Sequence, residues 1–211
     1  MTASKLINLR QQLLSLGNII PLRQHVCSTE VKKAISNYKE HFKPYNPRKA
    51  HYNRYGLSLT SKDGGFSGVP DLDSLYEYNK LHGTNFNEPD FRKWTPFFKD
   101  CTSLKSAIEP FHNYMGRSHI LRLNRGGFFP PHRDLSYSSF RLFISLCDNM
   151  QDYVFILDDK RIFFQQNQIY FINTLLSHSL FSFIDGCLFV VFNIDLNKEA
   201  VQAVLNNLSI C

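Results

Sequence analysis

The second half of the chain carries the apolar and polar alternation of β-strands. Four segments either alternate or consist almost wholly of apolar residues: 118–124, 138–146, 168–173 and 187–194. A Gly126-Gly127 turn and the pair Pro130-Pro131 follow the first segment and exclude a helix there. Short strands joined by turns predict a mainly β core, and we place it at residues 117–194.

Helical periodicity flanks this core on both sides. Asn197 stands where it would cap a C-terminal helix within 195–211, because its side chain can accept a bond from the first turn. The segment 1–116 is expected to be a helical and loop elaboration that packs on the core and walls its pocket, within one domain of 211 residues. Its expected elements are helices over 6–16, 28–42, 72–81 and 103–115 and an edge strand over 53–61.

Composition is that of a folded domain, with 43% hydrophobic and 20% charged residues. No apolar run reaches the length of a membrane span, and the N-terminal stretch lacks the continuous apolar region of a signal peptide. The five cysteines are scattered and never in Cys-x-x-Cys spacing, which indicates free thiols in a reducing compartment. We therefore expect a cytoplasmic protein with no membrane partner.

Charge is unevenly distributed along the chain. Residues 1–62 hold eleven Lys and Arg against two Glu, a net charge of +9, and the remainder is −3, which gives the total of +6. The tract 43–55 interleaves basic residues with tyrosines, as a groove for single-stranded nucleic acid would. The alternatives are a solvated basic surface and a set of anion-binding groups that recognise a small carboxylate-bearing substrate. We favour these latter interpretations.

Three residues suggest metal chemistry. His132 and Asp134 form a His-x-Asp pair, and His178 follows after a few dozen residues. Two neutral imidazoles and one carboxylate are the ligands of the facial triad that holds non-haem Fe(II) and leaves positions open. A histidine beside an acid is also common as a plain structural feature. The alternation of strand and ligand around these residues favours the metal site, because a jelly roll brings separate strand ends to one mouth.

The runs LRLNRGGFFPPHRD, FRLFISL, INTLLSHSLF and LFVVFNIDL, in that order, resemble the catalytic core of the Fe(II)/2-oxoglutarate-dependent oxygenases. The similarity is nearest to the aspartyl/asparaginyl β-hydroxylase and proline hydroxylase branch. It implies a double-stranded β-helix, a cupin-like jelly roll, with flanking helices. It also implies that His132, Asp134 and His178 are iron ligands and catalytic residues. Fe(II), 2-oxoglutarate as cosubstrate and O₂ would then hydroxylate an amino-acid or peptidyl side chain.

The chain departs from that family at the arginine that usually binds the far carboxylate of 2-oxoglutarate. About ten residues beyond the distal histidine, the sequence has Asp185 to Leu188 and no basic residue. Arg141 matches a second arginine that the β-hydroxylases direct toward the cosubstrate, and Arg122 is the other contender. A buried arginine fork suits a carboxylate. The alternative for either arginine is a structural pair with one of the chain's own acids at the barrel rim, so the residue that binds the cosubstrate is left open by the sequence.

Further candidates are weaker. Asn173 precedes His178 and is expected near the metal or cosubstrate. Arg54 and Ser58 are expected as substrate contacts, while His119 alternates away from the Arg122 face and is expected to pack outward. The partner is expected to be a small-molecule or peptide substrate. Nucleic acid is disfavoured, because the nucleic-acid-demethylating oxygenases carry an Arg-x₅-Arg after the distal histidine and no arginine follows residue 161 here. A cupin-like metal-binding or regulatory protein without oxygenase activity, and a nucleic-acid oxygenase, are the alternatives.

Overall fold

Two antiparallel sheets face each other in the computed structural model, which describes residues 3–134 and 136–209. The larger sheet has the order β1 (Ile19–His25), β11 (Gln168–Ile172), β8 (Ser139–Ser145), β13 (Cys187–Asp195), β6 (His119–Leu123), β3 (Arg54–Ser58) and β2 (Lys43–Pro44). The smaller sheet has the order β10 (Lys160–Ile162), β9 (Tyr153–Leu157), β12 (His178–Ser182) and β7 (Phe128–His132). A separate pair joins β4 (Thr60–Ser61) to β5 (Lys93–Trp94). The predicted jelly-roll core with flanking helices is confirmed.

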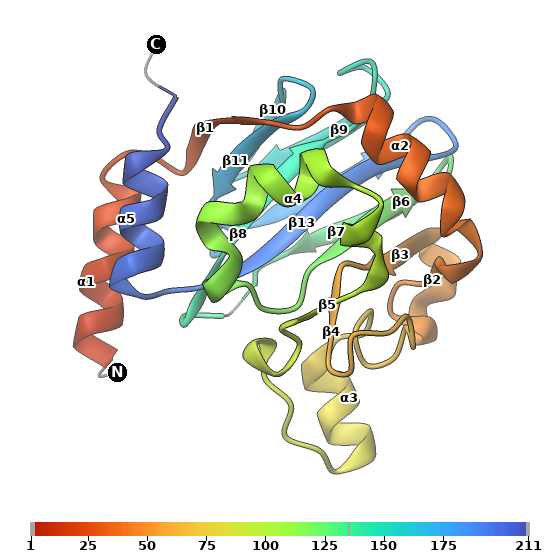
Figure 1. The fold of residues 1–211 in the computed structure, drawn as a ribbon, viewed down its shortest axis with the longest axis horizontal. Helices are drawn as coiled ribbons and strands as arrows, with labels where there is room; N and C mark the ends of the chain where they lie inside the picture. Colours follow the sequence, from red (N-terminus) through yellow and green to blue (C-terminus); the bar gives the residue numbers. More distant parts are fainter. Residues whose placement is uncertain (1–2, 135, 210–211) are drawn as a thin grey trace.

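Helices cover the outer face and one end of the larger sheet (Figure 1). Over the face lie α2 (Ser28–Asn37) and α4 (Thr102–Ile108), and at the end lie α1 (Ala3–Leu14) and α5 (Lys198–Asn206). The remaining helix, α3 (Leu75–His82), lies apart from the sheet. Short 3₁₀ turns lie at Lys39–His41, Pro47–Tyr52, Glu88–Asp90, Pro96–Lys99 and Glu109–Tyr114. The side chain of Asn197 accepts from Ala200 N at 2.7 Å, so the predicted cap of α5 is confirmed. The end of the predicted C-terminal segment, residues 210 and 211, lies outside the described residues. No helix in the described part is both long enough and apolar enough to cross a membrane.

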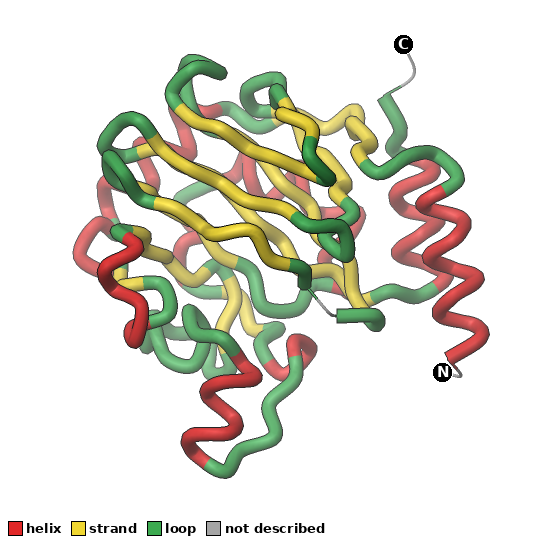
Figure 2. Tube along the Cα trace, turned by 180° about the vertical axis from the view of Figure 1, so that it is seen from behind, coloured by secondary structure: helices red, strands yellow, loops and turns green. Residues whose placement is uncertain are grey.

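Two hydrophobic cores lie on opposite faces of the larger sheet. The outer core packs residues such as Ile120 and Ile144 against the helices, and the inner core packs Leu121 and Phe143 between the two sheets. Seen from behind, strands face the viewer and the helices lie at the far side and the edges (Figure 2). Because both faces of its central strands are buried, the larger sheet shows little polar alternation.

The first 116 residues are more than an elaboration around the barrel. β1 pairs with β11, and β3 pairs with β6, so this part of the chain adds strands to both sides of the larger sheet. The expectation of a helical and loop segment is corrected at this point. β3 also lies one place inside the edge, because the two-residue β2 pairs with it. β1 was not predicted because it contains a proline and pairs with a strand about 150 residues away in sequence.

The segment that leads to His132 is extended, as its prolines require. Pro130 and Pro131 lie in β7, which is an edge strand of the smaller sheet, and an edge position tolerates residues without an N–H. The turn before β7 is tight. Gly126 has φ +75°, and a Cβ on Gly127 would lie 2.4 Å from the carbonyl oxygen of Asn53. This turn fixes where β7 begins.

We expect Gly127→Ala to destabilise the fold much more than Gly126→Ala. The methyl group at 127 meets backbone oxygens that cannot yield, at a cost of about 3 kcal/mol, whereas at 126 only the left-handed backbone costs about 1–2 kcal/mol. An added Cβ at 126 meets no described atom within 4 Å. Urea denaturation of both variants measures the difference, and equal losses would show that β7 does not depend on this close approach.

Candidate metal centre

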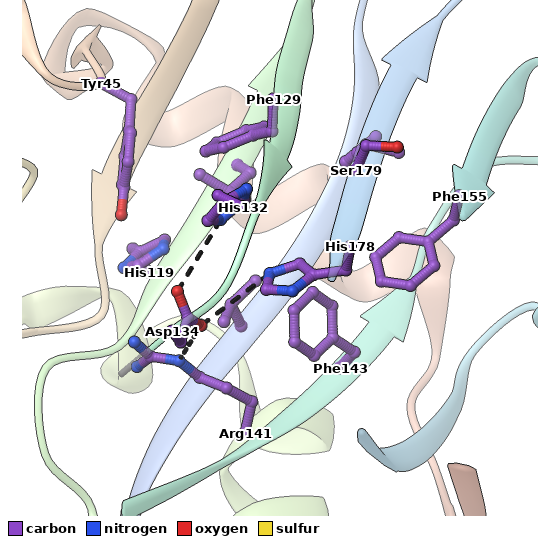
Figure 3. A pocket seen from close by; sticks show the side chains of 13 residues that line it. Tyr45, His119, Phe129, His132, Asp134, Arg141, Phe143, Phe155, His178 and Ser179 are labelled. Atoms are coloured by element: carbon purple, nitrogen blue, oxygen red, sulfur yellow. Dashed lines mark hydrogen bonds and ion pairs between the residues drawn. The ribbon is translucent and has the colours of Figure 1, made fainter. Parts of the chain in front are cut away.

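The three predicted ligands meet at the mouth between the sheets (Figure 3). His132 ends β7 and His178 begins β12, and the two residues are direct partners across the antiparallel pair. The backbone N–H of Asp134 donates to Thr174 O at 2.9 Å, which holds this residue beside β12. One ligand atom from each of the three lies within 4.8 Å of the others.

Backbone contacts orient both imidazoles. His132 Nδ1 lies 2.7 Å from Pro130 O, and His178 Nδ1 lies 3.1 Å from Leu176 O. A carbonyl oxygen can only accept, so Nδ1 carries the proton and each Nε2 keeps its lone pair. The two Nε2 atoms lie 3.7 Å and 4.0 Å from the carboxylate oxygens of Asp134. Both lone pairs are therefore available to one ion.

The charge state of the site also suits a metal. Burial alone would raise the pKa of Asp134, but the guanidinium of Arg141 and the two imidazoles outweigh it and hold that pKa at about 2. Burial, together with His132, lowers the pKa of His178. At neutral pH the carboxylate is ionised and the buried imidazole is neutral, and these are the protonation states in which both groups bind a metal.

Arg141 links the triad to a second buried carboxylate. Its Nε donates to Asp134 Oδ2 at 3.1 Å, and its Nη2 lies 4.0 Å from Glu88 Oε1. Glu88 in turn accepts two bonds from Arg117, from Nε at 2.9 Å and from Nη2 at 3.0 Å. Arg141 Nη1 is buried and has no hydrogen-bond partner among residues 3–134 and 136–209. One N–H group of this arginine thus remains for a bound anion.

An inner cavity adjoins the triad. Its lining includes the apolar residues Phe143, Phe155 and Val191 together with polar ones. His119 is part of that lining: it is buried, its Nδ1 has no partner in the described part of the chain, and burial with two nearby arginines lowers its pKa to about 3. The expectation that His119 packs outward is corrected, because on β6 the inward residues are the odd-numbered ones.

A larger outer cleft opens over several of the same residues. Both spaces are lined by Tyr45, Phe129, His132, Asp134 and Arg141. Arg54, predicted as a substrate contact, lines this outer cleft. Glu88 and Arg117 were not predicted as residues of the site, because no local pattern marks either of them. Tyr45 was singled out only as part of the basic and aromatic tract 43–55.

Three other predicted site residues line neither the inner cavity nor the outer cleft. Arg122 lies on the outer face of β6, with its guanidinium 4.4 Å from the centroid of the Phe42 ring. Asn173 is buried and donates to Asn18 Oδ1 at 2.8 Å, and Ser58 donates to Asp71 Oδ2 at 3.3 Å. Arg122 points away from the cavity because side chains along a strand alternate between its two faces, and the even-numbered residues of β6 face the outer core.

The position where the oxygenase family usually has its arginine is occupied here by apolar residues of the two cores. Leu188, about ten residues beyond His178, packs against the outer core, while its neighbour Phe189 fills the inner one. Among the described residues that line the inner cavity, Arg141 is the one arginine or lysine. A cosubstrate carboxylate in this cavity would therefore meet its cation beside the triad.

The donor set fits a divalent transition metal. Two imidazole nitrogens and one carboxylate on one side of a cavity leave the facing side free for other ligands, which is the arrangement of the facial triad. The fold and this site together define a jelly-roll protein with a candidate 2-His-1-carboxylate metal centre.

No family model and no curated protein matches the chain. Among solved structures, it is similar to an oxidoreductase of the 2OG-Fe(II) oxygenase family from Burkholderia pseudomallei, with a TM-score of 0.47, 13% identity and 93% of each chain covered. HygX from Streptomyces hygroscopicus, with nickel and 2-oxoglutarate bound, gives a TM-score of 0.48 and 10% identity over 94% of this chain and 88% of its own. A predicted oxalate decarboxylase from Thermotoga maritima gives 0.34 and 20% identity over 42% and 74%. Similarities this distant do not establish a function, so the function has to be inferred from the geometry of the site.

We expect His132→Ala and Asp134→Ala to abolish binding of Fe(II), because each removes one of three ligands from a site that has no spare donor in the described structure. Anaerobic titration calorimetry measures the loss. His82→Ala is the matched control, since that histidine contacts Tyr78 on α3, away from the triad. Parental affinity in either triad variant would place the metal elsewhere.

Proposed function

We propose that this protein is an Fe(II)- and 2-oxoglutarate-dependent dioxygenase that hydroxylates an amino-acid or peptidyl side chain. The observation that carries the proposal is the convergence of His132, Asp134 and His178 at the mouth of a jelly roll, with their ligand atoms within 4.8 Å. The inner cavity on one side and the outer cleft on the other give room for a cosubstrate and a substrate at the same centre.

Iron and 2-oxoglutarate, when bound, supply the chemistry that activates O₂ for attack on a C–H bond. The protein's own residues hold and shield that chemistry. The backbone carbonyls of Pro130 and Leu176 keep both histidine Nε2 atoms directed at the metal position. Phe143, Phe155 and Val191 give the inner cavity an apolar surface that excludes water.

Arg141 is the residue best placed to bind a carboxylate of the cosubstrate. It is buried in the cavity lining, it is held by Asp134 and Glu88, and its Nη1 still lacks a partner in the described structure. Arginine presents a planar fork of N–H donors that matches a carboxylate. Arg122 does not share this role, because it lies on the other face of β6.

The rival function is a cupin-like protein that binds a metal without oxygenase activity. Its support is the lining of the inner cavity, where Arg141, already paired with Asp134, is the one arginine or lysine among the described residues. Assay of succinate formed from 2-oxoglutarate, with Fe(II) and O₂ present, separates the two functions. We expect Fe(II)-dependent succinate from the parent protein and none from His132→Ala. Metal binding with no succinate under any condition would favour the rival.

We expect Arg141→Ala to raise the KM for 2-oxoglutarate by about tenfold or more, and to lower kcat less, because it removes binding already present in the ground state. Arg141→Lys should recover part of the affinity, since the charge remains while the fork is lost. Steady-state succinate assays give both constants. Arg122→Ala is the control and should leave both unchanged. An unaltered KM in Arg141→Ala would assign the cosubstrate carboxylate to another group.

A further inference from the structure

Arg54 is buried in an aromatic setting. It lies on β3 and is only 6% exposed. Its guanidinium carbon lies 4.0 Å from the centroid of the Phe129 ring, 4.9 Å from that of Tyr52 and 5.4 Å from that of Tyr45. All three aromatic residues line the outer cleft, and Arg54 lines it with them. The charge therefore sits at the wall of the cleft and away from bulk water.

This guanidinium has no carboxylate partner in the described part of the chain. Its hydrogen bonding there is limited to one contact, from Nη1 to Phe128 O at 3.5 Å, and its buried Nε has none. An arginine offers five N–H donors, and leaving them unpaired in a buried place is costly. Burial lowers the pKa of Arg54, which is consistent with an uncompensated charge. Ring contacts offset part of the cost and leave the N–H groups free.

The other buried cations of the cleft already have partners. Arg117 is paired with Glu88, and Arg141 with Asp134. Lys49 at the rim is paired with Glu77. The cleft is lined by five arginines and lysines against two carboxylates, an excess of three positive charges. Among these groups, Arg54 is the buried one whose charge is unmatched.

Phe129 ties Arg54 to the metal centre. Its ring contacts the Arg54 guanidinium on one side, and its centroid lies 6.2 Å from that of the His132 ring. Together, the two distances place the guanidinium within about 10 Å of the His132 imidazole. A molecule of modest size can therefore reach both groups at once.

From this geometry we infer that Arg54 is the anchor for a carboxylate of the substrate, and that the substrate is a small carboxylate-bearing molecule, such as a free amino acid, whose apolar part lies against Phe129. The inference rests on the proposed function and narrows its substrate class. A carboxylate would fill the open N–H positions of Arg54 and leave the other end of the molecule at the triad. The aromatic wall would fix the orientation between these two points.

The test compares 3-phenylpropionate with its uncharged amide, 3-phenylpropionamide, as probes of the full chain loaded with Zn²⁺ in place of iron. Ligand-observed NMR measures both affinities. We expect the carboxylate to bind about tenfold more tightly than the amide, and Arg54→Gln to remove that preference while leaving amide binding unchanged. Arg54→Lys should retain part of it. Because the parent comparison needs no variant, a variant that fails to fold does not leave the inference untested.

Arg122→Gln is the matched control, because Arg122 also lies over aromatic rings but on the outer face of the sheet. It should keep the full preference. If the preference exists while Fe(II)-dependent succinate formation is absent, only the proposed function fails. Equal binding of the two probes, binding of neither, a preference untouched by Arg54→Gln, or tighter Arg54-dependent binding of phenyl phosphate would overturn the carboxylate assignment.

Discussion

The antiparallel pairing of β7 with β12 is the contact on which the candidate site depends. It sets His132 opposite His178, and a slip of one residue would turn one imidazole to the outer face of the smaller sheet. The edge position of β7 tolerates the two prolines before His132, and the prolines keep this segment extended. Asp134 follows two residues later, at the point where its N–H reaches Thr174 on the strand connection.

Next to this contact, carboxylates and guanidinium groups alternate in a series of ion pairs, so that each of these groups has a partner of opposite charge. Asp134, Arg141, Glu88 and Arg117 follow one another from the triad, through the 3₁₀ turn Glu88–Asp90, to the segment just before β6. Buried ions of this kind are tolerated only when they are paired. The series also explains why the first half of the chain is needed: Glu88 comes from it, and so do Tyr45 and Arg54 on the cleft wall. The triad and the cleft wall therefore lie together, and Arg54 is the buried cation of that wall that has no carboxylate partner among the described residues.

Much of this was predictable from the residues alone. The four central strands β6, β8, β11 and β13 of the larger sheet, the cap at Asn197 and the meeting of His132, Asp134 and His178 follow from local patterns and from the order of motifs. The strands of the smaller sheet were not predicted. The partners that come from far along the chain did not follow, because nothing local marks Glu88 as the neighbour of Arg141. The predicted directions of the Arg122 and His119 side chains on β6 were wrong. Both faces of this strand are buried, so its sequence pattern does not indicate which face is directed toward the cavity. β1 was missed for a related reason, as its pairing with β11 lies about 150 residues away in sequence.

The central claim is that the triad and Arg141 together hold iron and 2-oxoglutarate. The most direct test is an anaerobic titration of the metal-free protein with Fe(II) and then with 2-oxoglutarate, followed by visible absorption. A metal-to-ligand charge-transfer band that appears only when both are present, and that weakens in Arg141→Ala, is the result the account predicts. Iron binding without such a band at saturating 2-oxoglutarate would contradict it and would make the protein a metal-binding jelly roll of another function.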